Sequence, residues 1–464
     1  MTQALFYDFP PASKEAWKNQ AAKDLGGQDF DQALKSLLWE KIQIQPFYTR
    51  EDVLDLPRLP ENSFEDKPFL QDFSARSWSN FLAVYPSTPI QEIMDFLENG
   101  GEGLVLHLKG DENLNELLKD VIPDYISIML KPLGDPAQVL EHFMTWVHEM
   151  GVEESGLTGG LLWSPMDMLF EQGKSWEEAI SAFRRVFSCF PNERCFHACM
   201  FNFSRYAEAG ASGLDELIFG FGEIIELIDK SGIDPITIFE KSGFYTSVGD
   251  LHFPEIAKLK AIRFFYAELA LQYNVGLRLE DTCVFAQTSG WSKSTLDSNT
   301  NLIRQTYEAM ASILGGANGL WVRPISGQKA TELELRVARN VSFILNYESY
   351  FGKVGDPAAG SYYLDTLITQ LINEVKSGLQ ELEKNGGWLV AFESGMLHKK
   401  VREHRQKQQN SILSGEISKI GVNKYPASDY LKNNLEFSPI LEKEYELKPS
   451  RASYLVELQN QTGA

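Results

Sequence analysis

The chain reads Cys-Val-Phe-Ala-Gln-Thr-Ser-Gly-Trp-Ser over residues 283–292, where a short apolar run meets a polar turn that contains a glycine. Asp297 follows at a position suited to cap a helix, and the helical stretch after it ends at Gly315 and Gly316. An apolar strand, a polar turn and a capped helix together make one unit of an alternating α/β fold. The rest of the chain repeats this unit.

Apolar runs of the kind that forms buried strands lie at residues 78–85, 103–108, 126–130, 157–163, 196–203, 243–248, 283–286 and 320–322. Helix starts are recognisable between most of them: Thr88 before Pro89, Asp135-Pro136, Ser175 with Glu178, Ser212 with Asp215, and Asp234-Pro235. Strands that alternate with helices imply parallel strands and helical crossovers, and eight such units can close into a barrel. We therefore predict an α/β fold, a (β/α)8 TIM barrel. An open doubly wound sheet is the competing architecture, but no glycine-rich phosphate loop follows the first strand.

Three regions with different patterns divide the chain. Residues 1–75 form an N-terminal arm and linker, which has little core of its own and helical patches at 13–25 and 31–40. Residues 76–330 carry the barrel. Residues 331–464 form a helical extension, with helices expected at 332–347, 364–384 and 397–409. We expect the arm to wrap around the barrel or around a partner.

The composition narrows the class of protein. The chain has 464 residues and a formal net charge of −21, which argues against nucleic acid and anionic membranes as partners. Four cysteines in so long a chain make no disulfide framework and fit a reducing compartment. The N-terminus lacks a basic segment followed by an apolar one, and no apolar run approaches the roughly 20 residues of a membrane-spanning helix. We expect a soluble cytoplasmic protein.

A metal site is the first chemical possibility, because Cys195, His197 and Cys199 alternate along one predicted strand and share a face. Zinc would need a fourth ligand and a tight geometry that a single extended strand rarely supplies. We therefore expect no metal site. The nucleotide-binding GxxxxGK[ST], metalloprotease HExxH and hydrolase GxSxG patterns are also missing.

A polar turn at the end of a strand is the second possibility. Gln287 and Ser289 would lie at the carboxyl rim of a barrel, where catalytic groups gather, and their amide and hydroxyl groups can donate to a substrate carbonyl. The equally supported structural interpretation is a turn over which Trp291 packs.

The chain resembles the acyl-CoA-binding barrel of the cobalamin-dependent methylmalonyl-CoA mutases over roughly residues 75–425. The resemblance is densest over 282–316 and continues at 157–159, 208–211, 255–263, 337–340, 355–363 and 421–425. It implies a barrel that holds a coenzyme A ester along its axis, while adenosylcobalamin supplies the radical that interconverts methylmalonyl-CoA and succinyl-CoA.

The positions that carry chemistry in this family differ here. Residues 77–85 lack the tyrosine and arginine of the family's first strand, and Arg205 stands where the family has a histidine that contacts the thioester. After residues 157–159 the chain continues into Trp163 instead of a polar run, and Lys131 occupies an inner-strand position. Arg205, Gln287, Ser289, Trp163 and Lys131 are thus expected to form a vestigial active-site face, with no catalytic residue.

Bulky side chains such as Met129 and Met200 are expected to fill the axial tunnel. Each polar partner that a ligand loses costs about 1–3 kcal/mol. Several such losses predict that the ordinary ester no longer binds. A polyanionic ester also suits this acidic chain poorly unless local Lys or Arg residues offset the charge.

Cobalamin is the last element that the resemblance brings in. The family's Asp-x-His-x-x-Gly motif occurs around none of the seven histidines, and the chain ends before a cobalamin-binding domain could fit, so we expect this chain to bind no cofactor. The prediction is a non-catalytic small (beta) subunit of a heterodimeric methylmalonyl-CoA mutase, whose large (alpha) subunit holds adenosylcobalamin. The N-terminal arm and part of the helical tail would form a large apolar interface. The alternatives are an active acyl-CoA mutase barrel that uses a separate cobalamin-binding protein, and a barrel enzyme that has drifted to unrelated chemistry.

Overall fold

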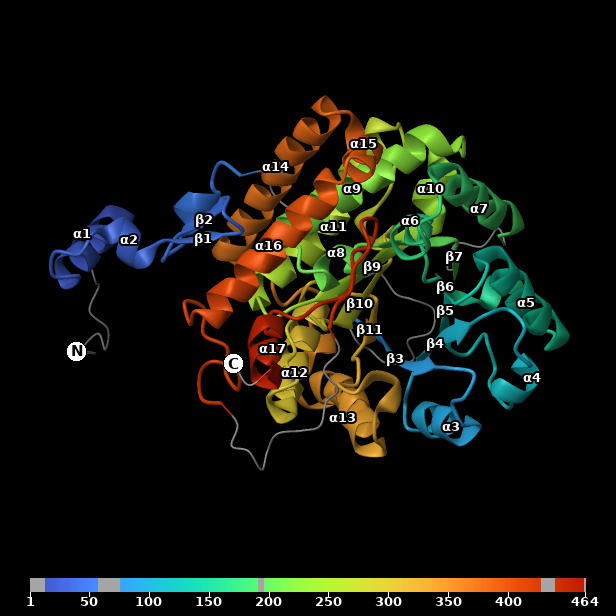
Figure 1. The fold of residues 1–464 in the computed structure, drawn as a ribbon. Coiled ribbons are helices and arrows are strands. Elements are labelled where there is room, and N and C mark those ends of the chain that lie inside the picture. Colours follow the sequence, from blue (N-terminus) through green and yellow to red (C-terminus); the bar gives the residue numbers. More distant parts are fainter. Residues whose placement is uncertain (1–12, 57–75, 191–195, 427–438, 463–464) are drawn as a thin grey trace, which may run out of the picture.

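The structure, a computed structural model, describes residues 13–56, 76–190, 196–426 and 439–462 (Figure 1). Cys195 and much of the linker before the barrel lie outside the described residues.

A parallel barrel forms the centre of the molecule. Its sheet runs in the order β7-β6-β5-β4-β3-β11-β10-β9-β8, and every neighbouring pair is parallel. The strands are β3 (Ser79–Val84), β4 (Gly103–Leu108), β5 (Ser127–Pro132), β6 (Thr158–Leu161), β7 (Phe196–His197), β8 (Cys199–Asn202), β9 (Ser242–Val248), β10 (Val284–Thr288) and β11 (Gly319–Trp321). The (β/α)8 barrel and all eight predicted strands are confirmed.

The closure of the barrel depends on one broken strand. β7 pairs with β6 and β8 pairs with β9, and only Ala198 separates these two segments. They are therefore two halves of the fifth barrel strand, each bonded to a different neighbour. The nine-segment sheet curls round through this strand into a barrel of eight strand positions.

Helices surround the barrel on its outer face (Figure 1). They are α3 (Ile90–Glu98), α4 (Leu114–Leu117), α5 (Pro136–Glu149), α6 (Met166–Gln172), α7 (Trp176–Cys189), α8 (Ser204–Glu208), α9 (Gly213–Ser231), α10 (Pro235–Lys241), α11 (His252–Gln272), α12 (Ser298–Leu314) and α13 (Glu332–Phe343). Short 3-10 turns are η1 (Arg50–Val53), η2 (Glu154–Gly156), η3 (Leu279–Asp281), η4 (Gly327–Lys329) and η6 (Phe351–Lys353).

Most predicted helix caps are confirmed, because the side chains of Asp135, Ser175, Ser212, Asp234 and Asp297 accept backbone N–H bonds from the first turn of their helices. The prediction for α3 was wrong. Pro89 itself occupies the N-cap position, and the Thr88 hydroxyl accepts from the Tyr85 N–H at 2.9 Å. Thr88 therefore closes the turn after β3 instead of capping the helix.

The N-terminal arm contains α1 (Lys14–Asp24), α2 (Phe30–Leu34) and a hairpin of β1 (Ser36–Leu38) and β2 (Ile42–Ile44). The helix predicted over 31–40 was wrong in its second half, because Trp39 and Glu40 adopt positive φ and turn the chain into the hairpin. The hairpin contacts α14 (Tyr362–Lys384), whereas α1 and α2 bury no residue and project from the body (Figure 1).

The C-terminal part supplies α14, α15 (Gly387–Glu393), α16 (Met396–Leu413) and α17 (Tyr454–Thr462). The predicted helix 332–347 is α13 followed by a π-turn, Ile344–Glu348. The segment 440–453, the C-terminal strap, crosses the carboxyl rim of the barrel (Figure 1). Its Ser450 and Ala452 N–H groups donate to the carbonyls of Glu208 and Trp291 at 2.8 and 2.9 Å. Within the described residues, no helix is long and apolar enough to cross a membrane.

Candidate functional site

The axis of the barrel is filled by side chains. The inward positions of the strands form one buried cluster, the lumen cluster, made of Phe81, Val105, Met129, Leu162, Met200, Tyr245, Phe285 and Trp321. The rings of Phe81 and Phe285 meet edge to face with centroids 4.9 Å apart. Met129 and Met200 lie in this cluster, at inner positions as the sequence predicted.

Glycines on neighbouring strands make room for these large side chains. A Cβ at Gly103 would overlap the ring of Phe81, and one at Gly319 would lie 2.8 Å from both Phe81 and Phe285. A Cβ at Gly243 would lie 2.8 Å from the Met200 sulfur. Interiors tolerate neither voids nor overlap. The lumen is therefore a packed core in which small and large positions complement one another.

A polar layer lies directly above the lumen cluster, at the carboxyl ends of β9 and β10. The Gln287 amide nitrogen donates to Ser204 Oγ at 2.8 Å and Ser247 Oγ at 2.7 Å, and its oxygen accepts from the Tyr245 hydroxyl at 2.6 Å. All four side chains are buried. Both N–H donors of Gln287 are thus committed to the protein, so the amide offers no spare donor to a substrate carbonyl.

Arg205, at the start of α8, is held by a buried ion network. Its guanidinium pairs with Asp167 of α6 and with Glu223 of α9, the latter at 2.8 Å, and lies 4.7 Å from the ring centre of Phe170. Burial alone would lower the pKa of Arg205, but the two carboxylates hold it above its usual value. The charge of Arg205 is therefore neutralised within the helical layer.

Ser289 belongs to a second carboxylate network. Its hydroxyl donates to Glu208 Oε1 at 3.0 Å, and the Gly290 N–H donates to the same oxygen at 2.9 Å. Arg323 approaches the other Glu208 oxygen at 3.3 Å. Glu208 therefore fixes the turn after β10. Sequence reasoning missed this role, although Glu208 opens one of the segments that carry the family resemblance.

Lys131 and Trp163 lie in different surroundings. Lys131 Nζ lies 5.1 Å from the ring centre of Tyr245, and no carboxylate of a described residue pairs with it within 4 Å. Burial opposes a charged Lys131, but Tyr245 and Asp167 raise its pKa. Trp163 is buried in the outer core between strands and helices, away from the lumen cluster. The polar layer thus brings Lys131 near Gln287 through Tyr245, while Trp163 serves packing.

His107 on β4 was not singled out from the sequence. Its ring stacks on Tyr85 with centroids 4.2 Å apart and meets Trp321 at 6.0 Å. Burial, with the nearby Lys131 charge, lowers the pKa of His107 to about 4. The imidazole is therefore neutral at pH 7.

The resemblance segment 255–263 is structural. Lys258 pairs with Glu216 at 2.7 Å and with Glu255 at 2.8 Å, and is fully buried. Arg263 donates to the Gly316 carbonyl at 2.6 Å and to the Leu279 carbonyl at 3.1 Å. These bonds tie α11 to α9 and to the loops that precede β10 and β11.

The possible metal-binding strand is the broken strand of the barrel. His197 ends β7, and Cys199 begins β8 with its side chain in the outer core. Among the residues that the structure describes, no three His, Cys, Asp or Glu side chains are grouped to hold a metal ion.

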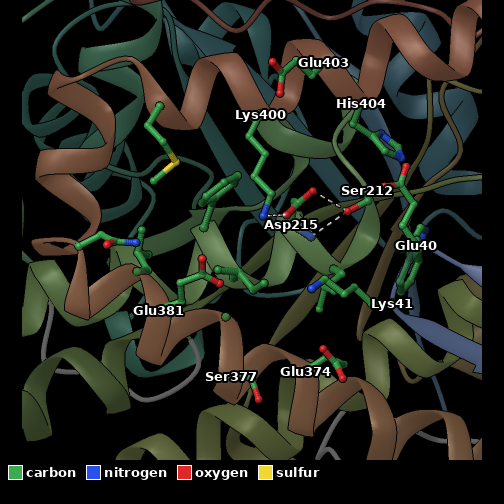
Figure 2. Close-up of a pocket in the computed structure, with 18 of the residues that line it drawn as sticks. Glu40, Lys41, Ser212, Asp215, Glu374, Ser377, Glu381, Lys400, Glu403 and His404 are labelled. Carbon is green, nitrogen blue, oxygen red and sulfur yellow. Dashed lines mark hydrogen bonds and ion pairs between the residues drawn. The ribbon is translucent and has the colours of Figure 1, made fainter.

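A separate pocket of about 660 Å³ lies between the N-terminal hairpin, α9, α14 and α16 (Figure 2). Figure 2 shows Lys400 reaching Asp215, to which it is ion-paired at 2.6 Å, and Asp215 accepting from the Ser212 hydroxyl at 2.8 Å. Glu40 of the hairpin pairs with Lys407. Several of the charged side chains that line this pocket are therefore paired with one another.

Comparison with known proteins identifies the family. Residues 98–461 match the family model described as methylmalonyl-CoA mutase. The chain belongs to the methylmalonyl-CoA mutase family. It is 27% identical to the methylmalonyl-CoA mutase small subunit of Porphyromonas gingivalis, over 91% of this chain and 71% of that protein.

Two longer mutases are similar as well. The mitochondrial methylmalonyl-CoA mutase of Bos taurus is 27% identical over 91% of this chain, and the methylmalonyl-CoA mutase of Escherichia coli is 28% identical over 67% of it. This chain covers 62% and 45% of those proteins, less than two thirds of each. In this member of the methylmalonyl-CoA mutase family, side chains pack the barrel axis, and the polar side chains at the rim are hydrogen-bonded to one another.

Proposed function

We propose that this chain is the non-catalytic supporting subunit of a heterodimeric methylmalonyl-CoA mutase. The large (alpha) subunit would hold adenosylcobalamin and interconvert methylmalonyl-CoA and succinyl-CoA. The observation that carries the proposal is the lumen cluster, which fills the axis along which the family resemblance places the coenzyme A ester.

The energetics of opening the lumen support this proposal. Displacing one buried Phe or Met side chain into water costs about 1.5–3 kcal/mol. A pantetheine chain would have to displace several, among them Phe81, Met129 and Phe285. It would also break the hydrogen bonds of Gln287 to Ser204 and Ser247. The polar partners that the family resemblance implies for the ester are missing here, so no new hydrogen bonds would replace them. Binding of the ester to this barrel is therefore disfavoured.

A partner is suggested by the similarity to a protein named as a small subunit. We place the interface on the N-terminal arm and part of the helical tail. The arm exposes Leu37 and Leu54, by 61% and 62%, and its Trp17 stacks on Phe47 at 4.8 Å. Apolar surface of this kind is typical of obligate interfaces, which bury about 2,000 Å² or more. A cytoplasmic location fits the free thiols of Cys189 and Cys199.

The decisive experiment is affinity capture of the tagged chain from its own host, with the mass and stoichiometry of what it retains. An equimolar companion that carries both a barrel and a cobalamin domain is the expected result. A small cobalamin-binding protein in its place would favour the alternative, an active mutase barrel that uses a separate cobalamin carrier.

A matched pair of variants tests the interface. Leu54 of the arm and Leu271 at the end of α11 are both 62% exposed. Leu54→Glu should abolish capture of the companion, whereas Leu271→Glu should leave it unchanged. Equal capture by both variants would remove the arm from the interface.

A further inference from the structure

A second pocket lies in the wall of the barrel, between the carboxyl halves of β3 and β11. It has a volume of about 240 Å³, and its floor and walls are the apolar side chains of Phe81, Leu82, Ala83, Phe96, Trp321, Val322, Leu335 and Ala338. We call it the lateral pocket. It contains both inward-facing and outward-facing residues of the two strands, so it opens sideways through the wall.

The strand pairing explains why the wall opens here. β11 and β3 pair only at Gly319 with Ser79 and at Leu320 with Asn80, whereas β3 pairs with β4 over four positions up to Val84. Beyond Asn80 the two strands separate, and the space between them is covered by α3, α13 and the turn η4. The Tyr85 hydroxyl is hydrogen-bonded to Gln328 of that turn, which closes the outer end.

Cationic groups line the rim of the lateral pocket, in a chain that is acidic overall. Among the residues that the structure describes, the Arg323 guanidinium pairs with one carboxylate, Glu208 at 3.3 Å, and it lies 5.8 Å from the Trp321 ring centre. Arg339 pairs with Asp95 at 3.0 Å, and within the described part of the chain its buried Nε has no acceptor. Donors of both guanidiniums therefore remain for a ligand.

One acidic side chain, Glu92, also lines the lateral pocket. Burial raises the pKa of this carboxyl, because the ionised form is poorly solvated there. Glu92 therefore opposes an anion less than a fully exposed carboxylate would. Each of the two guanidiniums is paired with a carboxylate, so the attraction of this pocket for an anion rests on their remaining N–H donors.

We propose that the lateral pocket binds a small apolar carboxylate, with its hydrocarbon or aromatic body between Phe96 and Trp321 and its carboxylate at Arg323. A planar guanidinium matches a carboxylate through two parallel N–H bonds. Tyr85 and Trp321 supply flat faces for an aromatic or branched body. The volume lies just below the range of about 300–1,000 Å³ that drug-sized ligands occupy, so the ligand has one ring or a short branched chain.

The lateral pocket shares Phe81 and Trp321 with the lumen cluster, but it differs from the axial path of a coenzyme A ester because the lumen cluster stays packed across the axis. The proposal holds whether or not the chain supports a catalytic partner. A coenzyme A thioester is far too large for this volume.

The test measures binding of benzoate to the full chain by ligand-observed NMR and calorimetry, with benzamide as the neutral probe and benzylamine as the cationic one. Benzoate should bind at least about tenfold tighter than benzamide, since a hydrogen bond to a charged group is worth that much. Benzylamine should not bind. Phenyl phosphate distinguishes a general anion site from a carboxylate site, and tighter binding of phenyl phosphate would overturn the ligand class.

Two variants and one control locate the site. Arg323→Gln should weaken benzoate at least about tenfold, and Ala330→Trp should block the pocket from the loop that covers it. Arg336→Gln removes the same charge from an exposed position of α13 and should bind benzoate like the unmodified chain. Equal affinity for benzoate and benzamide would contradict the proposed site. Benzoate binding that is unchanged in both Arg323→Gln and Ala330→Trp would contradict it as well. Thermal melts show which variants are folded, and Ala330→Trp keeps the test valid if Arg323→Gln does not fold.

Discussion

Phe285→Ala tests directly whether the barrel axis is a packed core or a closed tunnel. Phe285 is completely buried in the lumen cluster and makes aromatic contacts to Phe81 at 4.9 Å and Tyr245 at 5.8 Å. Truncation of a buried Phe to Ala costs about 3–5 kcal/mol, through lost transfer free energy and the cavity left behind. Phe285 has two aromatic partners, and each such pair is worth about 0.5–1.5 kcal/mol. We therefore expect a cost toward the upper end of this range.

The assay is guanidinium unfolding of the full chain, followed by tryptophan fluorescence and by near-ultraviolet circular dichroism. Phe253→Ala is the matched control, because Phe253 is 51% exposed at the start of α11. We expect the control to lower the free energy of unfolding by less than about 1 kcal/mol.

A difference between the two variants below about 1 kcal/mol would refute the packed lumen. It would mean that the neighbours of Phe285 relax into the space without loss, as around a tunnel held open for a ligand. A coenzyme A ester could then enter this barrel without the cost of displacing packed side chains.

Four further substitutions probe the rim and the packing. Arg205→Met leaves two buried carboxylates without their cation and should cost about 3–5 kcal/mol, measured by the same unfolding assay. His107 has a pKa of about 4 in the folded protein against a usual 6.5. The free energy of unfolding should therefore fall by up to roughly 3 kcal/mol as the pH falls from 6.5 to 4. His107→Phe should remove this part of the acid sensitivity, measured as the unfolding midpoint at pH 7.5 and pH 5. Gly103→Ala should cost about 1–3 kcal/mol through overlap with Phe81, and Phe81→Leu in the same chain should recover part of that loss.

Each of these expectations has a clear contrary result. An Arg205→Met variant as stable as the parent would show that the carboxylates are solvated. An unchanged acid sensitivity in His107→Phe would assign the sensitivity to other groups. Additive costs for Gly103→Ala and Phe81→Leu would mean that the two positions do not touch.

The barrel could be predicted from the sequence because each strand is a compact apolar run and most helices begin with a local capping residue. Both signals act over a few positions along the chain. The N-terminal arm shows where local signals fail: residues 36–38 suit a helix by composition, yet the left-handed turn at Trp39 and Glu40 pairs them with β2. Positive φ at a non-glycine residue has little sequence signature.

The site was harder to predict, because its partners are distant in sequence. Arg205 is a natural candidate to face a ligand until Asp167 and Glu223, 38 and 18 residues away, are seen to hold its charge. Gln287 likewise reaches Ser204 across 83 residues. The bulky inner positions were predictable from strand alternation, but their fit to Gly103 and Gly319 on other strands required the register.

The C-terminal strap also sets the order in which the molecule can be completed during synthesis. The carbonyls of Glu208 and Trp291 receive their N–H donors from Ser450 and Ala452. Translation proceeds at about 5–20 residues per second, so the turn after β10 waits on the order of 8–32 s for the C-terminal strap to be made. Until then Trp291 and the two carbonyl groups at the rim are exposed, and a chaperone can bind the nascent barrel there. A segment made late in synthesis thus completes a rim whose other residues were made many seconds earlier.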